Sequence, residues 1–188
     1  MNIAVITGSP HKNGTTALLA DEFIRGASEA GNDVFRFDAA FRKVHPCIGC
    51  GRCDGNAGIH CSFTDDMDEL YKSILKSDLI VLVSPVYYWT LSPQILGVIS
   101  RWEYMVQRLR GKKLILLTAR YNPDDTWTLE PIRLWYRNLQ KSVGLIGAGE
   151  IHAVGAETRK ELELTEYPKQ AYLLGRKTGA ESADETSG

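Results

Sequence analysis

The sequence predicts an α/β domain in which a doubly wound, five-stranded parallel sheet of order 2-1-3-4-5 carries helices on both faces. Five short apolar runs alternate with segments of helical period, and this alternation is typical of βαβ units. At 188 residues the chain has the length of one ordinary domain with one full-sized core. The five runs are Ile3 to Ile6, Val34 to Phe37, Leu79 to Val83, Leu114 to Leu117 and Leu145 to Val154.

The first two helices are predicted from apolar spacing and from their end signals. Apolar side chains between Leu18 and Ala27 recur three and four residues apart, and Gly31 can end this helix because it tolerates positive φ. A second helix is expected from about Thr64 to about Lys76, since acidic residues in its first turn favour the positive end of the helix dipole.

The third predicted helix has the clearest start. Ser92 is a good N-cap and Pro93 fits the first helical position, and an apolar stripe runs on to Leu109. Within this helix Trp102 is expected to pack in the core, whereas Arg101 is expected to face solvent.

The C-terminal part predicts two more helices and a tail. One helix lies between about Thr128 and Ser142, with Pro131 in its first turn, and the last follows Pro168. Residues 177–188 contain no large apolar side chain and are expected to be a disordered tail, so the folded domain spans residues 1–176.

The net charge and the lengths of the apolar runs argue against binding to nucleic acid and to membranes. The formal net charge is −1 at pH 7, so the chain has no electrostatic footprint for nucleic acid or an anionic membrane. The N-terminus shows no basic, apolar leader, and no apolar run reaches the roughly 18 residues that a membrane span needs. We expect a cytoplasmic protein whose partners are small molecules or other proteins.

The segment from Thr7 to Thr16, directly after the first strand, predicts a phosphate site. Its glycines and hydroxyls, followed by a helix N-terminus, suit an anion. The segment lacks the Gly-Lys-Ser/Thr end of a nucleoside triphosphate loop and the third glycine of a dinucleotide loop. A single phosphomonoester, as in FMN, fits Ser9, Thr15, Thr16 and the backbone amides.

The third apolar run leads into Pro85 and three successive aromatic residues, Tyr87, Tyr88 and Trp89. In an open parallel sheet of this order a ligand lies beyond the carboxyl ends of the first and third strands. Because consecutive residues cannot all face one side of a strand or a helix, at least one aromatic side chain should line the site. Flat rings here suit an isoalloxazine ring.

Four segments appear together in this chain, which are Gly8 to Thr16, Cys47 to Cys53, Asp65 to Met67 and Ser84 to Tyr88. In this combination and order they resemble the family of NAD(P)H-dependent FMN reductases and iron–sulfur flavoproteins. The resemblance implies a flavodoxin-like fold, tightly held FMN, and a homodimer or homotetramer in which the flavin lies near the subunit interface.

The resemblance also implies roles for individual residues of this chain. It implies phosphate binding by Ser9, Asn13, Thr15 and Thr16, and contact with the flavin ring by Pro85, Val86, Tyr87 and Tyr88.

We add His11, Trp89 and Ala119 to the expected cofactor-binding residues. His11 stands where the family usually has Arg or Lys, and Thr15 stands where it often has Asn. Ala119 belongs to the segment from Thr118 to Trp127, which follows the fourth strand. This segment is polar and aromatic and is either substrate-facing or a connector.

Three cysteines, Cys47, Cys50 and Cys53, are spaced by two residues, and Cys61 follows. Such a run of thiolates can converge on one inorganic centre, and it resembles the cysteine motif of iron–sulfur flavoproteins, with Cys61 completing a [4Fe–4S] site. The sequence leaves open two alternatives: reduced thiols that bind nothing, and a zinc site near His45 and His60. A redox-active disulfide needs a perturbed thiol, which the sequence does not show.

The resemblance implies an FMN-dependent oxidoreductase that passes electrons from NAD(P)H through bound FMN to a quinone, a flavin or a protein acceptor. Because the flavin supplies the redox chemistry, no catalytic acid or base residue is expected. The alternative is an iron–sulfur flavoprotein that transfers electrons between ferredoxin-like partners and FMN, and a third reading is a non-redox phosphate-binding module.

Overall fold

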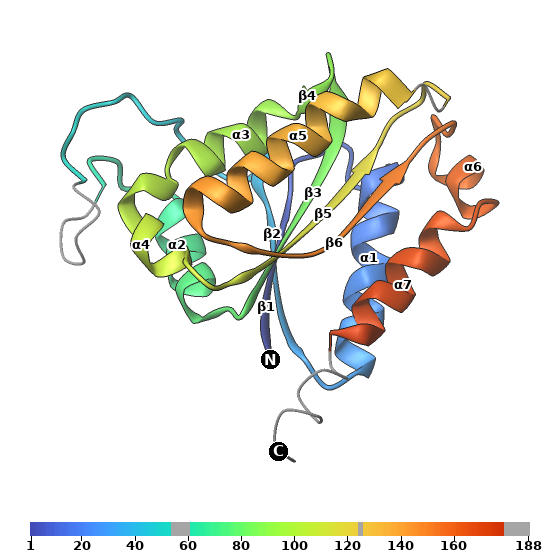
Figure 1. Ribbon diagram of the computed structural model, residues 1–188, viewed down its shortest axis with the longest axis horizontal. Helices are drawn as coiled ribbons and strands as arrows, with labels where there is room; N and C mark the ends of the chain where they lie inside the picture. Colours follow the sequence, from blue (N-terminus) through green and yellow to red (C-terminus); the bar gives the residue numbers. More distant parts are fainter. Residues whose placement is uncertain (54–60, 124–125, 179–188) are drawn as a thin grey trace.

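The computed structural model describes residues 1–53, 61–123 and 126–178, which form a three-layer α/β/α domain (Figure 1). Five parallel strands lie side by side in the order β2-β1-β3-β5-β6, so the predicted sheet and its order are confirmed. These strands are β1 (Asn2–Thr7), β2 (Asp33–Asp38), β3 (Leu79–Tyr87), β5 (Lys113–Ala119) and β6 (Ile146–Ala153).

Both faces of the sheet are covered by helices, as the near-continuous apolar strands require. In β1 the side chains of Ile3 and Val5 enter one core, and those of Ala4 and Ile6 enter the other. One face carries α1 (Thr15–Glu29), α6 (Arg159–Glu163) and α7 (Tyr167–Lys177), as Figure 1 shows. The other carries α2 (Met67–Lys76), α3 (Pro93–Ser100), α4 (Val106–Leu109) and α5 (Thr126–Val143).

The third predicted helix is interrupted. Ser92 caps α3 as expected, its Oγ accepting the Ile95 N–H at 3.4 Å, but α3 ends at Ser100. The 3₁₀ turn η2 (Trp102–Met105) and the short α4 follow. The break lies at Arg101, which the sequence placed in solvent and which is only 2% exposed. Its backbone leaves the helical path while its side chain turns into a buried ion pair, described below.

Four further elements differ from the prediction, and one of them is the five-residue helix α6, which the apolar spacing did not predict. A two-residue strand, β4 (Thr90–Leu91), pairs antiparallel with the end of β3, and a 3₁₀ turn, η1 (Ala39–Phe41), follows β2. The helix α5 begins at Thr126, so that Pro131 lies past the first turn, on an exposed position.

The predicted tail begins later than expected. Lys177 is the last residue of α7, and the Thr178 hydroxyl is buried, accepting a hydrogen bond from the Asn32 amide at 3.0 Å. The remainder of the predicted tail, 179–188, lies outside the described residues. Across the part of the chain that the structure describes, no helix is both long and apolar enough to cross a membrane.

Two glycines allow α1 and α7 to cross in direct backbone contact. A Cβ at Gly26 would overlap the carbonyl oxygen of Tyr172, and one at Gly175 would overlap the carbonyl oxygen of Phe23. Both neighbours are backbone atoms, which cannot turn away as a flexible side chain can. The two helices therefore pack only as closely as glycine permits.

We expect Gly26→Ala to lower the free energy of unfolding by about 3 kcal/mol, because overpacking outweighs the better helix propensity of alanine. Urea denaturation checks this value. Gly97→Ala is the matched control: Gly97 lies in α3 with nothing within 4 Å of its added Cβ, and that variant should be neutral or more stable. Equal stability of the two variants would contradict the packing account.

Candidate functional site

The loop between β1 and α1 lies against the start of α3. The Gly8 N–H donates to the Val83 carbonyl at 2.9 Å, which ties the loop to the end of β3. A Cβ at Gly8 would overlap the Ser92 Oγ at the N-cap of α3. The loops after β1 and β3 therefore meet at one edge of the sheet.

Hydrogen bonds within the loop between β1 and α1 shape its backbone, and the loop leads into the N-terminus of α1, which has no side-chain cap. Ser9 Oγ accepts the His11 N–H at 3.1 Å, and the Gly14 N–H donates to the His11 carbonyl at 3.2 Å. Gly14 is the N-cap of α1, where no side chain caps the helix and the first turn holds no acidic residue. The backbone N–H groups and the positive end of the helix dipole are thus left for an anion.

A cleft of about 720 Å³ opens over this loop. Its volume falls within the range usual for cofactor sites. On one side it is lined by seven of the predicted cofactor residues, which are Ser9, His11, Asn13, Thr15, Thr16, Pro85 and Tyr87. On the opposite side it is lined by Glu157, Thr158 and Arg159, which come from the connection between β6 and α6. No sequence motif marked these three residues.

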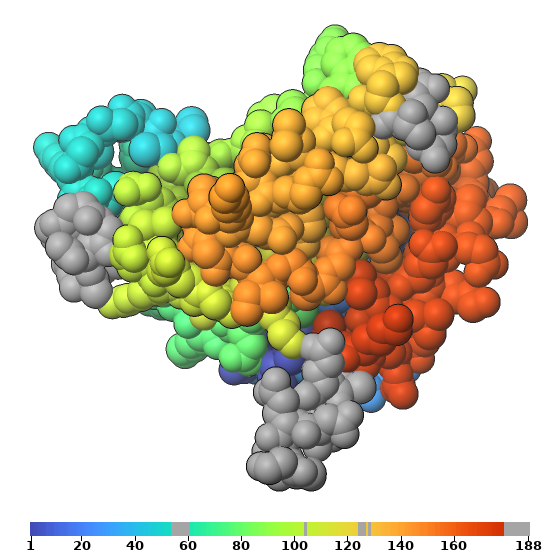
Figure 2. Space-filling view, viewed as in Figure 1, coloured from blue at the N-terminus to red at the C-terminus, as the bar shows by residue number. Residues whose placement is uncertain are grey.

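The three successive aromatic residues form the tip of the hairpin between β3 and β4. Tyr88 and Trp89 both have positive φ, +47° and +61°, a conformation that two-residue hairpin turns require and that Asn and Gly usually supply. Two aromatic residues in this conformation store strain, which is typical of functional sites. Tyr88 is 92% exposed, and in Figure 2 the tip projects from the molecule.

A second groove, of about 300 Å³, lies beside this tip. It is lined by three of the predicted cofactor residues, Val86, Tyr88 and Trp89, together with Arg120, Tyr121 and Asn122. The Trp89 ring also lies 5.8 Å from the ring of Trp127, measured between centroids. The segment after β5 therefore contributes directly to a groove at the hairpin tip.

Ala119 does not line either cleft. It is buried in β5, where it pairs with Pro85 of β3 and Ala153 of β6. Its small side chain packs in the core on the α1 side of the sheet. Its expected contact with the cofactor stays a prediction.

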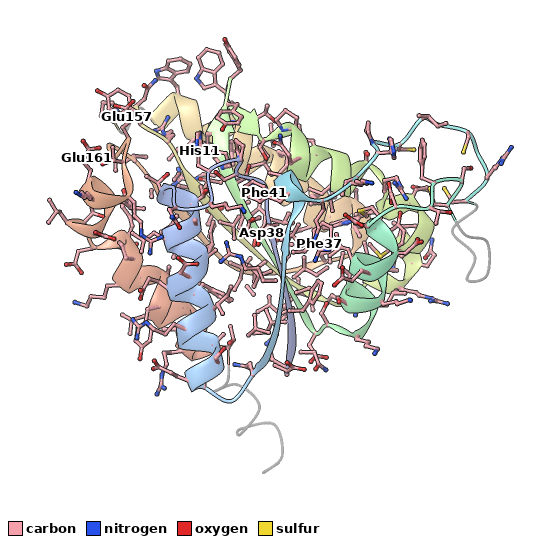
Figure 3. All side chains as sticks on the ribbon, turned by 180° about the vertical axis from the view of Figure 1, so that it is seen from behind. His11, Phe37, Asp38, Phe41, Glu157 and Glu161 are labelled. Atoms are coloured by element: carbon pink, nitrogen blue, oxygen red, sulfur yellow. The ribbon has the colours of Figure 1, made fainter. Side chains whose placement is uncertain are left out.

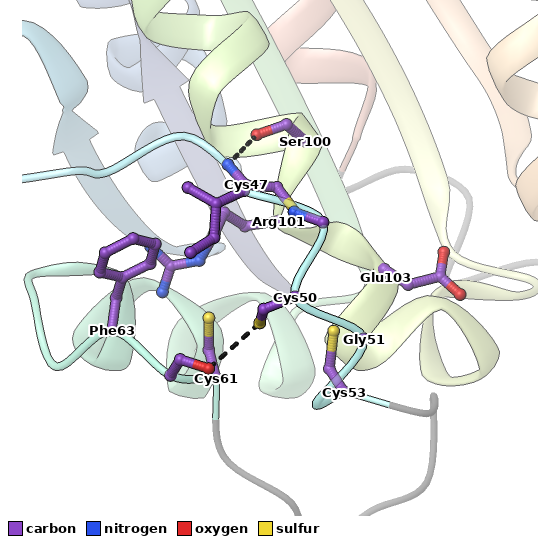
Figure 4. Close-up of a pocket in the computed structure, with 12 residues that line it drawn as sticks. Cys47, Cys50, Gly51, Cys53, Cys61, Phe63, Ser100, Arg101 and Glu103 are labelled. Atoms are coloured by element: carbon purple, nitrogen blue, oxygen red, sulfur yellow. Dashed lines mark hydrogen bonds between the residues drawn. The ribbon is translucent and has the colours of Figure 1, made fainter.

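The four cysteines line one pocket of about 190 Å³ (Figure 4). Cys47 and Cys50 are exposed, and Cys53 and Cys61 are half-buried. Figure 4 shows Cys50 between Cys53 and Cys61 along the pocket. Among the described residues, no three His, Cys, Asp or Glu side chains are arranged to hold a single metal ion.

The thiols lie in different environments. A hydrogen bond with the Ser62 hydroxyl at 3.2 Å, together with a backbone N–H of the loop, lowers the pKa of Cys50. Burial raises the pKa of Cys53, and the neighbouring thiols raise it further. Of the histidines named for zinc, His45 stacks on the Phe63 ring at 4.7 Å, and His60 lies outside the described residues.

A buried ion pair anchors this cysteine segment to the body of the protein. Arg101 and Asp65 are almost fully buried and meet through two contacts, at 2.9 and 3.3 Å. Arg101 also donates to the His45 carbonyl at 3.0 Å and to the Tyr71 hydroxyl at 3.1 Å. No sequence signal marks this network, because its members are spread over 57 positions and Arg101 follows an apolar stripe.

The pKa values reflect that network. Burial acts to raise the pKa of Asp65, but Arg101 and the backbone N–H groups of His45 and Met67 outweigh it, so that the pKa lies below its usual value. Burial raises the pKa of Tyr71 to about 12 despite the adjacent guanidinium. Asp65 is therefore ionised, and Tyr71 is neutral, near pH 7.

Comparisons with known proteins agree with this architecture. Residues 1–149 match the model of the NADPH-dependent FMN reductase family. An iron–sulfur flavoprotein of Archaeoglobus fulgidus is 34% identical over 160 residues, covering 82% of this chain and 68% of that protein. One of Methanocaldococcus jannaschii is 35% identical over 101 residues, covering 54% of this chain and 51% of that protein, so the match spans about half of its length.

Solved structures extend the likeness in fold. An NAD(P)H:quinone oxidoreductase from Methanothermobacter marburgensis superposes with a TM-score of 0.74 at 17% identity, covering 95% of this chain and 96% of that one. At that identity the likeness concerns the fold, which is flavodoxin-like. The family match, the fold and the loop at β1 agree, and the chain belongs to the NADPH-dependent FMN reductase family of oxidoreductases, with curated relatives named iron–sulfur flavoproteins.

Proposed function

We propose that the chain binds FMN across the two clefts and passes electrons from NAD(P)H through it to a quinone, a flavin or a protein acceptor. One observation carries this proposal: the hydroxyl-rich loop after β1 and the aromatic hairpin after β3 meet at the carboxyl edge of the sheet. This is the edge at which doubly wound sheets bind their ligands.

The residues present suit FMN. The uncapped N-terminus of α1 and the side chains of Ser9, Asn13, Thr15 and Thr16 would hold its phosphate. The strand end at Pro85 and Val86 and the aromatic side chains that follow would contact its ring. When bound, FMN accepts electrons from a nicotinamide and releases them to an acceptor, so the chain's own residues bind, orient and shield it. A homodimer or homotetramer, implied by the resemblance, belongs to the same proposal.

Steady-state oxidation of NADH and NADPH by the FMN-loaded protein tests the electron donor. We expect oxidation of at least one nucleotide in the presence of a quinone or free flavin. A loaded sample that ignores both nucleotides but accepts electrons from ferredoxin would contradict NAD(P)H as donor and favour the electron-transfer function considered next.

A second candidate function rests on the cysteine pocket. We propose that Cys47, Cys50, Cys53 and Cys61 hold a [4Fe–4S] cluster, which would supply one-electron transfer. The support is that all four line one pocket, beside a segment anchored by a buried ion pair. A cluster presents a separate iron to each thiolate, so its ligands need not meet at one ion.

Iron and sulfide analysis under anaerobic conditions tests this cluster. We expect about four iron atoms per chain in the unsubstituted protein and a loss of most of them in Cys50→Ser, because one thiolate ligand is removed. Ser28→Ala, at an exposed position of α1, is the control and should keep its iron. If the unsubstituted protein contains no iron, the cluster hypothesis is wrong. If it contains zinc instead, the alternative metal site is established.

A further inference from the structure

Arg159 lines the phosphate cleft from the side opposite the loop. It is the first residue of α6, and it lies beyond residue 149, where the match to the family model ends. Figure 3 shows His11 of the loop between this segment, marked by Glu157 and Glu161, and the region of η1, marked by Phe41. The cleft thus has a wall that the family motifs do not describe.

The Arg159 guanidinium is fixed in place by two carboxylates. Its Nη1 donates to Asp21 Oδ2 at 3.0 Å, and its Nε donates to Glu163 Oε1 at 3.2 Å. Asp21 belongs to α1, and its other oxygen accepts a hydrogen bond from Arg36 at 2.7 Å. Within the described residues these two pairs leave Arg159 Nη2 without an acceptor. The side chain is 32% exposed, so a ligand in the cleft can reach it.

The segment that carries Arg159 is itself held firmly. Thr158 caps α6, its Oγ1 accepting the Glu161 N–H at 3.3 Å, and the Glu161 carboxylate accepts the Thr158 N–H at 3.0 Å. This reciprocal capping box fixes the backbone on the N-terminal side of Arg159. A guanidinium placed in this way loses little conformational freedom when it binds an anion.

The loop itself supplies no comparably fixed cation. Lys12 also lines the cleft, but its ammonium lies over the Phe41 ring, 4.9 Å from the centroid, on the side away from α6. Of the two cationic side chains of the cleft, Arg159 is the one held by carboxylates.

We propose that Arg159 binds the 5′-phosphate of FMN in this cleft, with Asp21 as its positioning residue. The inference rests on the proposed function and adds a phosphate ligand from outside the β1 loop. A phosphomonoester carries between one and two negative charges at pH 7, and a guanidinium makes short, charge-assisted hydrogen bonds to such oxygens. The same chemistry would suit the 2′-phosphate of NADPH, so the test separates the two sources.

The test compares FMN with riboflavin, which lacks the phosphate. Each flavin is titrated into the flavin-free protein, and binding is followed by quenching of flavin fluorescence. We expect Arg159→Gln to weaken FMN binding about tenfold or more and to change riboflavin binding by less than about twofold. Arg133→Gln is the matched control, because Arg133 lies on α5, is 36% exposed, pairs with Glu130 of α5 and Glu150 of β6, and does not line the cleft.

Each other outcome overturns the inference. Equal weakening of FMN and riboflavin binding would show that Arg159 only ties α6 to α1. Unchanged binding of both flavins would show that Arg159 does not contact the phosphate. Loss of kcat/KM with NADPH but not with NADH, at unchanged FMN affinity, would move it to the nicotinamide nucleotide. If the unsubstituted protein bound no FMN at all, the proposed function would fail as well, so the two failures are distinguishable.

Discussion

Replacing Asp65 by alanine is expected to lower the free energy of unfolding by about 3–5 kcal/mol, because it leaves the Arg101 guanidinium buried and unpaired. Both side chains are almost fully buried, and Asp65 also accepts the backbone N–H groups of His45 and Met67. The loss therefore includes an ion pair and the anchoring of the segment that carries the cysteines. Urea denaturation at pH 7 measures it.

The double variant Asp65→Ala/Arg101→Ala separates the ion pair from general packing. Since it removes both charges, it should lower the free energy of unfolding clearly less than the two single variants do in sum, whereas strict additivity would contradict coupling of the pair.

The stabilisation by Asp65 depends on pH in a defined direction. Because the folded-state pKa of Asp65 is lowered, its contribution is fully present above the unfolded-state pKa, about 4, and is lost as the pH falls through the folded-state value. The difference between Asp65→Ala and the unsubstituted protein should therefore shrink below about pH 4.

Replacing Ser9 by glutamate is expected to weaken FMN binding by about 100-fold or more. The side chain would place a carboxylate in the space that the phosphate needs, and two like charges about 4 Å apart repel by about 4 kcal/mol near a protein surface. Ser9 lies within the loop, where its Oγ accepts the His11 N–H. Flavin titration measures the affinity, and circular dichroism checks that the domain stays folded.

Ser9→Gln is the control for size, since glutamine has the shape of glutamate without its charge. We expect Ser9→Gln to weaken FMN binding much less than Ser9→Glu does. Riboflavin binding should respond alike to both variants, because riboflavin has no phosphate to be repelled. Equal losses of FMN affinity would show that bulk, and not charge, disturbs the loop, and this would contradict the phosphate assignment.

The sheet could be predicted from the sequence because its parallel strands are buried on both faces and therefore appear as uninterrupted apolar runs. The short strand β4 could not, since two residues produce no periodicity. The positive φ of Tyr88 and Trp89 also goes against the usual sequence signal of a tight hairpin, which is Asn or Asp followed by Gly. The end of α3 before Arg101 could not be predicted either, because the partner of Arg101, Asp65, is distant in sequence.

The candidate site also contains residues that could be predicted from the sequence and residues that could not. The β1 loop and the β3 aromatic residues could be found because each is a contiguous segment with distinctive chemistry. Arg159 could not, because a single arginine at the start of a short helix resembles any solvent-exposed charge, and only the folded chain brings it to Asp21 and the cleft. Convergence of the four cysteines on one pocket was suggested by their spacing, whereas the ion pair that anchors them was not.

If the loop after β1 holds the phosphate of FMN, the protein must distinguish FMN from riboflavin, and a titration with both flavins measures this difference. FMN and riboflavin are each titrated into flavin-free, unsubstituted protein at the same salt concentration. We predict one FMN site per chain and an affinity for FMN about 100-fold or more above that for riboflavin, because only FMN presents the charged phosphate to the loop. Equal affinity for the two flavins, or no binding of either, would contradict the claim.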